Sequence, residues 1–314
     1  MPYPGLRVRV LGSVVIIQPL ESAGEQALSL TVDLKSGRVE LAPQAPIKND
    51  CLVVLAMVGV MSLSSQAAVA LVTGAEQVAT VSGHPIFRVT QTKVLEAERR
   101  TRDPGDDRYM ALLKAALDPE AHGRGLYFSL GLNLTLSAEH RATGLADGAS
   151  AEKHMYAKED ARFFWNRNLC TKLIDANAHG FIYPLVQGFV GQLDSLVFRN
   201  KERYASASIT LIARRSVQRV GTRHWRRGAD KQGNVANFVE TEQLVDFDNG
   251  KHVASHVQIR GSIPLLWTQI PNIKYKPPTE MAGRSAHASV FDQHMSHLLE
   301  VYKVIICFPI WRCI

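Results

Sequence analysis

The richest chemistry in the sequence lies in one basic stretch, RRSVQRVGTRHWRRGADKQGN, at residues 214–234, where six arginines occupy the first fifteen positions. The segment from Arg199 to Lys231 holds ten basic and two acidic residues, a net charge of +8, whereas the whole chain carries +7. A basic excess confined to one segment indicates a local field directed at an anion. Arginine presents a rigid fork of donors that fits phosphate oxygens, so phosphate is the first candidate. A solvated basic face is the alternative that composition leaves open.

The candidate anion ligands in this stretch are four basic side chains. They are Arg223, Arg226, Arg227 and Lys231. Gly228 and Gly233 lie among them and allow tight turns that bring backbone amides and basic side chains to one anion. Arg215 and Arg219 have a structural alternative, because they are also placed to pair with an acidic residue nearby. The acidic residues considered for this pairing are Glu240, Glu242 and Asp230.

Three further polar residues extend the candidate site. Asn237 and Glu240, in NFVETEQ, could position the hydroxyl groups of a ligand or orient an arginine, and cross-strand structural bonding is the alternative. Arg260, in QIRGSIP, is a weaker candidate for the same groove. Trp225 and Trp267 are expected to anchor the core, because large aromatic side chains are mostly buried.

The bulk composition indicates an ordinary globular protein. The 314 residues suffice for one large or two medium domains, and 46% are hydrophobic and 21% charged. Four cysteines, Cys51, Cys170, Cys307 and Cys313, show no disulfide spacing, which favours reduced thiols inside the cell. The first twenty residues alternate like a strand and lack the features of a signal peptide. No P-loop or dinucleotide fingerprint is present, and no cofactor is expected.

One apolar stretch, residues 51–74, resembles a membrane span in length. The polar sequence SLSSQ interrupts it, and a spanning helix needs roughly 20 consecutive apolar residues. The pattern therefore predicts a buried helix over 51–62, capped by Asp50, and then a core strand over 67–73.

The remaining patterns predict a β-rich first part and a mixed second part. Residues 1–150 contain short strands, and a loop at 141–154 is the best domain boundary. The other predicted elements are a helix over 107–117, a half-buried strand over 125–136, a helix over 158–176 with Phe164, Leu169 and Leu173 on one face, a strand over 206–213, and a hairpin over 238–261 turning at Asn249-Gly250.

Four motifs in order carry a family resemblance. They are RFFWN (162–166), RRSVQRVGTRHWRRGADKQGNVANFVETEQ (214–243), QIRGSIPLLWTQIPNIKYKPP (258–278) and the spacing of Phe291, His294, Leu298 and Tyr302. The chain resembles the Sac-domain phosphoinositide phosphatases over residues 1–302. The resemblance implies an α/β (α+β) fold in which a β-rich N-terminal subdomain, 1–150, precedes the first part of an incomplete α/β Sac catalytic subdomain, 151–302. Residues 303–314 form a divergent tail.

The resemblance also implies a reaction and a catalytic loop. Members of the family dephosphorylate inositol lipids through a cysteinyl-phosphate, on a loop with five residues between a cysteine and an arginine. Here no cysteine has an arginine six positions later, and Cys307 and Arg312 have only four residues between them. The loop is therefore expected to be missing from this chain, which contributes no catalytic residue. Two functions stay open: a phosphatase acting on monophosphates such as phosphatidylinositol 4-phosphate, or an inactive phosphoinositide-binding or regulatory fragment.

The expected partner is a phosphoinositide headgroup at an anionic membrane surface. The resemblance places the chain at the cytosolic face of internal membranes, endoplasmic reticulum or Golgi, without a transmembrane segment of its own. No nucleic-acid module is recognisable, so no nucleic acid is expected. The pairs His252/His256 and His294/His297 bring no further ligand, so no metal is expected. Protein partners stay unknown.

Overall fold

The computed structural model describes most of the chain. The described residues are 1–21, 28–43, 51–98, 103–119, 125–146, 155–200, 203–221, 226–247, 252–270 and 278–307. The chain divides into two compact units. The first unit comprises Met1–Arg214 and Thr241–Val257, and the second comprises Arg215–Glu240 and Gln258–Ile314. The predicted boundaries at 150 and 302 stay a prediction.

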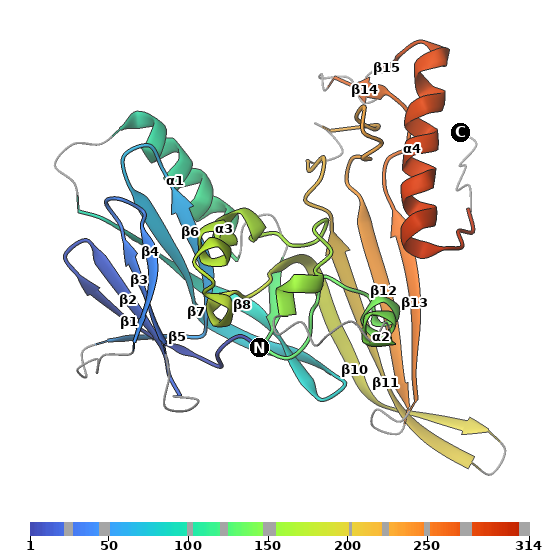
Figure 1. Cartoon of the computed structure of the whole chain (residues 1–314). Helices are drawn as coiled ribbons and strands as arrows, with labels where there is room; N and C mark the ends of the chain where they lie inside the picture. Colours follow the sequence, from blue (N-terminus) through green and yellow to red (C-terminus); the bar gives the residue numbers. More distant parts are fainter. Residues whose placement is uncertain are drawn as a thin grey trace. The chain divides into compact units, whose positions relative to one another are not determined.

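Strands predominate among the described elements (Figure 1). The strands are β1 (Leu6–Leu11), β2 (Val14–Pro19), β3 (Leu28–Asp33), β4 (Val39–Pro43), β5 (Leu52–Val54), β6 (Ala56–Ser62), β7 (Ala67–Val81), β8 (His84–Glu96), β9 (Gly125–Ser129), β10 (Val186–Asn200), β11 (Arg203–Arg215), β12 (Val239–Phe247), β13 (His252–Arg260), β14 (Trp267–Gln269) and β15 (Thr279–Met281). The helices are α1 (Pro104–Leu117), α2 (Ala138–Ala146), α3 (Arg167–Asp175) and α4 (Arg284–Tyr302), with short 3₁₀ helices at Met155–Lys158 and His179–Phe181.

The start of the chain builds a five-stranded sheet in the order β4-β3-β2-β1-β5. Alternate apolar residues of β1 and β2 turn to one side, so Leu6, Val8 and Ile17 are buried. Gly12 joins the two strands with a φ of +61°, a conformation that favours glycine. The strand expected at the start of the chain is therefore confirmed, and it continues into a hairpin.

The second sheet has eight strands in the order β13-β12-β11-β10-β9-β8-β7-β6. Each neighbouring pair from β6 to β11 runs antiparallel, and β7 with β8 forms a long hairpin interrupted by bulges. The largest core cluster joins apolar residues of both sheets with residues of α3, among them Leu71, Phe128 and Leu173. Strands, antiparallel sheets and a few covering helices confirm the expected α/β (α+β) class.

The helix predicted over 51–62 is wrong, because this segment forms β5 and β6 instead. β6 lies at the edge of the eight-stranded sheet but is buried on both faces, and a continuous apolar run of this kind has no period that separates strand from helix. The β-branched Val58 and Val60 suit a strand. Gly59 has a φ of +145°, and a Cβ there would lie 2.5 Å from the Leu169 carbonyl oxygen of α3. Asp50, the predicted cap, lies outside the described residues.

The RFFWN motif ties α3 to the strands around it. The side chain of Asn166 donates to the carbonyl oxygens of Val58 (2.7 Å) and Tyr183 (2.9 Å) and accepts from the Leu185 amide (2.8 Å). Phe164 is buried in the main core just before the helix. α3 is therefore shorter than the helix predicted over 158–176, because Asn166 bonds to β6 and to the segment before β10 and stands at the cap position before the first turn.

Most other predicted elements agree with the structure. α1 covers the helix predicted over 107–117, β7 contains the strand predicted over 67–73, and β11 contains that over 206–213. β12 and β13 are the neighbours expected of the hairpin, and its Asn249-Gly250 turn lies outside the described residues.

Two predicted segments need correction. The strand predicted over 125–136 ends at Ser129, because the Asn133 side chain accepts from the Thr135 amide and closes a turn. The loop predicted over 141–154 is helical as far as Ala146, where α2 ends, and its remainder is not described. No helix among the described residues is long and apolar enough to cross a membrane.

Candidate anion-binding site

The basic loop, residues 226–238 of the second unit, folds back on itself as a tight hairpin. Ala229 and Val235 form an isolated β-bridge, and the Ala236 amide donates to the Gly228 carbonyl (2.9 Å). Gly228, Gly233 and Asn237 have φ values of +63°, +79° and +57°. These left-handed positions reverse the chain direction within a few residues, as the two glycines predicted.

Asp230 holds the tip of the basic loop from inside. Its Oδ1 accepts from the backbone amides of Gln232 (3.0 Å) and Asn234 (2.9 Å), and its Oδ2 accepts from the Asn234 side chain (3.1 Å). These bonds form a side-chain turn typical of aspartate. The carboxylate of Asp230 is therefore occupied with the backbone of its own loop.

Arg219 braces the start of the basic loop. Its guanidinium donates to the carbonyl oxygens of Gly228 (3.0 Å) and Arg227 (2.8 Å). Burial lowers the pKa of Arg219 below its ordinary value, and the charge of Asp230 acts in the opposite direction. Arg219 therefore braces the loop backbone, and its hydrogen bonds go to carbonyl oxygens where the sequence suggested an acidic side chain.

Asn237 orients an arginine, one of the two roles predicted for it. Its Oδ1 accepts from the Arg215 guanidinium (3.4 Å), which also donates to the Gly221 carbonyl. The Asn237 side-chain amide donates to the Arg226 carbonyl (3.3 Å). Asn237 therefore connects the two sides of the basic loop instead of presenting its amide freely to a ligand.

The candidate ligands differ in exposure. Arg226 and Lys231 are exposed, whereas Arg227 is half-buried with its guanidinium 5.6 Å from the Trp267 ring centroid. The Nε of Arg227 is buried and has no hydrogen-bond partner within the described part of the chain. Trp267 is half-buried, so it is less enclosed than the core anchor we expected. Arg223 and Trp225 lie outside the described residues.

Arg260 lies two residues before a backbone contact with the basic loop. It is exposed at the end of β13, and the Ser262 amide just after it donates to the Ala236 carbonyl of the basic loop (2.9 Å). A Cβ at Gly261 would lie 2.6 Å from the Val235 side chain. The predicted group of Arg226, Arg227, Lys231, Asn237 and Arg260 is therefore gathered on and beside one loop.

Helix α4 supports the basic loop from one side. The Nδ1 of His294 lies 2.9 Å from the Gly233 carbonyl, and burial lowers the pKa of this histidine. Tyr302 donates to the Glu240 carboxylate. His294 is thus structural, as its place in the motif suggested, and Glu240 contacts a tyrosine of α4. Within the described residues no group of three or more histidine, cysteine, aspartate or glutamate side chains could hold a metal.

The side chains that brace the basic loop belong to the motifs quoted from the sequence. Arg219 and Asn237 lie in the motif at 214–243, and His294 lies in the spaced motif on α4. The SacI homology domain model matches residues 55–310. The chain belongs to the SacI homology domain family. The match runs through both units, so the family's pattern includes the core strands as well as the basic loop.

Three relatives illustrate the SacI homology. Two proteins of Arabidopsis thaliana, phosphoinositide phosphatases SAC7 and SAC6, are 34% identical over 299 and 316 residues, which cover 93% and 97% of this chain but 48% and 51% of those proteins. The Saccharomyces cerevisiae phosphatidylinositol-3-phosphatase SAC1 is 31% identical over 275 residues, 84% of this chain and 41% of that protein. The chain spans about half the length of these curated relatives.

The described cysteines differ sharply in environment. Cys170 is fully buried, its thiol donates weakly toward the Val58 carbonyl (3.6 Å), and burial raises its pKa to about 12. Cys51 and Cys307 are also free, the first half-buried and the second exposed. The buried thiol expected from the sequence is therefore found at Cys170, where a thiolate nucleophile is strongly disfavoured.

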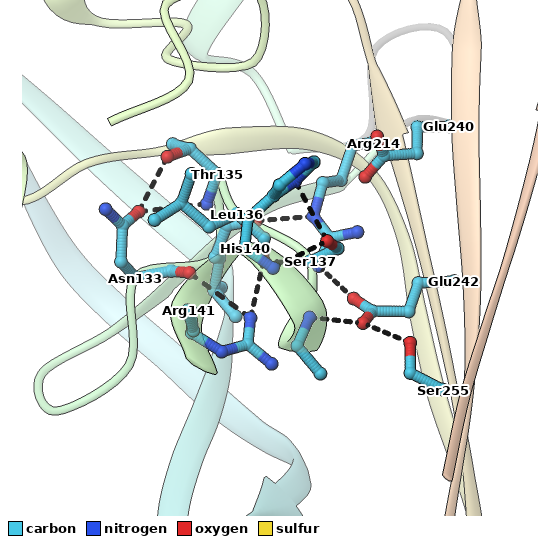
Figure 2. Close-up of polar contacts among 12 residues, drawn as sticks. Asn133, Thr135, Leu136, Ser137, His140, Arg141, Arg214, Glu240, Glu242 and Ser255 are labelled. Carbon is cyan, nitrogen blue, oxygen red and sulfur yellow. Dashed lines mark hydrogen bonds and ion pairs between the residues drawn. The ribbon is translucent and has the colours of Figure 1, made fainter. Parts of the chain in front are cut away.

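The sequence did not single out Arg214, yet this residue forms a fully buried ion pair in the first unit (Figure 2). Arg214 pairs with Glu242, and both side chains have no exposed surface. Arg214 also donates to the carbonyl oxygens of Leu134 (2.6 Å) and Leu136 (2.9 Å). Glu242 accepts from the Ala138 amide (2.6 Å) at the start of α2. The only signal in the sequence is a double arginine before the basic loop and a glutamate after it.

We predict that Glu242→Gln strongly destabilises the first unit. Arg214 would stay charged and buried without its counter-ion, which costs about 3–5 kcal/mol. Denaturant unfolding of the chain, followed by fluorescence at neutral pH, measures the loss. The double variant Arg214→Met with Glu242→Leu removes both charges and is expected to recover much of it, so a double variant as unstable as Glu242→Gln would contradict the prediction.

The same pair predicts a specific acid sensitivity. Burial acts to raise the pKa of Glu242, but the Arg214 charge and the Ala138 amide outweigh it and hold the pKa below its ordinary value of 4.5. The stabilisation from Glu242 is therefore complete above pH 4.5 and is lost as the pH falls through the lowered folded-state pKa. In unfolding measurements across this range, Glu242→Gln should lose less stability than the wild type.

Gly228→Ala should distort the basic loop. The φ of +63° costs an alanine about 1–3 kcal/mol, and its Cβ would lie 2.7 Å from the Leu265 carbonyl and close to that of Trp267. Faster hydrogen exchange in the 226–238 segment measures the effect. Gly283→Ala is the matched control, because nothing lies within 4 Å of its added Cβ; equal effects of the two substitutions would contradict the prediction.

Proposed function

We propose that this chain recognises the phosphate groups of phosphoinositide headgroups through its basic loop. The observation that carries the proposal is the separation of roles within the loop. Asp230 and Arg219 are bonded to the loop backbone, whereas Arg226 and Lys231 are exposed on the same turn. The fixed backbone limits the entropy lost when these side chains close on an anion. Arg227, Arg260 and Arg223 complete the proposed set of ligands.

The printed names of the relatives support the class of ligand. The Arabidopsis relatives are named phosphoinositide phosphatases, and the yeast relative is named a phosphatidylinositol-3-phosphatase. We extend this to phosphatidylinositol monophosphates, with the 4-phosphate as the preferred example. The lipid would be met at the cytosolic face of endoplasmic reticulum or Golgi membranes, where anionic lipids attract a basic surface. Contact with the membrane would be peripheral.

We further propose that this chain by itself binds the headgroup without turning it over. Hydrolysis through a cysteinyl-phosphate needs a thiolate beneath phosphorus and an arginine that closes on its oxygens. No cysteine of the sequence has an arginine six positions later, and Cys170 is buried with a raised pKa. We therefore favour the second function for this chain, that of a fragment that binds phosphoinositides without hydrolysing them. The phosphatase activity of the family requires a cysteine and an arginine at the proper spacing.

Flotation with phosphatidylcholine vesicles containing phosphatidylinositol 4-phosphate tests the proposal. We expect Arg226→Ala with Lys231→Ala to weaken binding at least tenfold, since a charge-assisted bond to phosphate is worth about 1.5–3 kcal/mol and each 1.4 kcal/mol is tenfold. Arg284→Ala, which removes one exposed charge from α4 in the same unit, is the control and should weaken binding less than twofold.

Two outcomes would contradict these proposals separately. Equal flotation of the wild type and the Arg226/Lys231 variant would remove the basic loop as the recognition site. Release of inorganic phosphate from the lipid, lost when the cysteines are replaced by serine, would show turnover and overturn only the binding-without-hydrolysis proposal. Vesicles with phosphatidylserine at matched charge distinguish phosphate recognition from general attraction to an anionic surface.

A further inference from the structure

The turn between β1 and β2 presents two apolar residues to solvent. Leu6 and Val8 of β1 are buried, whereas Val10 and Leu11 at the end of the same strand are 48% and 47% exposed. Neither exposed residue belongs to a core cluster of the described residues. We call residues 10–14 the hairpin tip. It therefore carries apolar side chains that the core of the first unit does not use.

The hairpin tip has a fixed backbone. β1 and β2 stay paired as far as Leu11 opposite Val14, and Gly12 takes the left-handed φ of +61° that the tight turn requires. The Leu34 amide, from the turn after β3, donates to the Ser13 carbonyl (2.7 Å). The tip is thus already ordered, so little backbone entropy is lost when its side chains enter another medium.

Two arginines stand behind the hairpin tip on β1. Because side chains alternate along a strand, Arg7 and Arg9 project to the same face as Leu11. At a rise of about 3.3 Å per residue, Arg9 lies roughly 7 Å and Arg7 roughly 13 Å behind Leu11. The ion pairs found among the described residues include neither arginine. The strand is therefore apolar at its end and cationic behind it.

The neighbouring turn between β3 and β4 keeps this region basic. Lys35 is exposed, and Arg38 forms an exposed pair with Glu40 (2.5 Å). Asp33 pairs with Val14 across the sheet, and its carboxylate accepts from the Lys35 amide (2.9 Å). The hairpins β1–β2 and β3–β4 together hold four basic and two acidic residues, so a positive charge remains around the tip.

We propose that the hairpin tip is a membrane contact, at which Val10 and Leu11 enter the headgroup region of an anionic bilayer and Arg9 and Arg7 meet its phosphates. Interfacial segments bury their apolar side chains about 5–10 Å into the boundary between headgroups and acyl chains, which fits the spacing from Leu11 to Arg9. Basic side chains gain from the negative potential of the cytosolic leaflet. A specific protein interface needs about 800 Å² from each partner, more than two side chains provide.

This contact is separate from the headgroup site of the basic loop. The hairpin tip belongs to the first unit and the basic loop to the second. The SacI homology domain model matches residues 55–310, so the tip lies outside the matched residues. The inference concerns an anionic lipid surface in general and does not rest on recognition of phosphoinositides.

Flotation with vesicles of phosphatidylcholine and phosphatidylserine, without phosphoinositide, tests the contact. Val10→Asp with Leu11→Asp should weaken binding of the full chain about tenfold, because two apolar side chains become charges of the bilayer's own sign. Val53→Asp with Leu55→Asp is the matched control. These residues of the same unit are 53% and 40% exposed and flank Val54, which pairs with the far end of β1. The control should weaken binding much less, by about twofold.

Two further variants report the depth and the charge of the contact. Leu11→Trp adds a fluorophore at the hairpin tip, and its emission, taken as the difference from the wild type, should be quenched by lipids brominated on the acyl chain. Arg9→Gln should weaken flotation about fivefold, since one basic side chain near an anionic surface has an effect of this size.

The proposal fails if flotation of the Val10/Leu11 variant equals that of the wild type, or if the wild type does not bind these vesicles. An equal loss in the control, or an unquenched Leu11→Trp, would also contradict it. A dimer of the chain that the aspartates dissociate would instead assign the hairpin tip to a second copy. Unchanged thermal melting of the Val10/Leu11 variant shows that lost binding reflects the surface and not the fold.

The same vesicles separate this contact from the proposed function. The Arg226/Lys231 variant should keep its binding to phosphatidylserine vesicles and lose the increase that phosphatidylinositol 4-phosphate gives. The Val10/Leu11 variant should show the opposite pattern, with weak binding to phosphatidylserine vesicles and the phosphoinositide increase retained. Each proposal can therefore fail while the other stands.

Discussion

The buried pair of Arg214 and Glu242 is the constraint on which the path of the chain depends. Arg214 is the last residue before the chain leaves the first unit, and Glu242 is the second residue after it returns. Neither side chain has exposed surface, and buried charges cost free energy unless their remaining donors and acceptors are bonded. Here Arg214 donates to a carbonyl oxygen, and Glu242 accepts from a backbone amide and a serine hydroxyl. The two ends of the segment that carries the basic loop are thereby held together.

Within that segment, arginines that look equivalent in the sequence have different structural roles. Arg215 and Arg219 donate to backbone carbonyls and fix the loop, whereas Arg226 is exposed and available to a ligand. A cluster of like charges would repel itself if every member faced the same point. Directing some arginines to carbonyl oxygens spreads the charge and makes the loop rigid.

This chain combines a basic loop with an eight-stranded sheet whose central strands carry exposed apolar side chains at Phe189 and Leu193. The loop is braced by its own backbone and by α4, so its conformation is set locally. The sheet differs, because its strands pair residues that lie far apart in the sequence, such as Val186 of β10 with Tyr127 of β9. The conformation of the loop and the pairing of the sheet are therefore fixed by separate sets of contacts.

The sequence by itself determined the family, the fold class, and the gathering of Arg226, Arg227, Lys231 and Asn237 on one loop, because long motifs, turn glycines and charge are local properties. It could not determine that residues 51–62 are strands, because a segment buried on both faces has no diagnostic period. Nor could it select Arg214 as the partner of Glu242 or show that Phe189 and Leu193 are exposed. Both depend on which distant strands pair, and only the tertiary structure decides that pairing and the burial that follows from it.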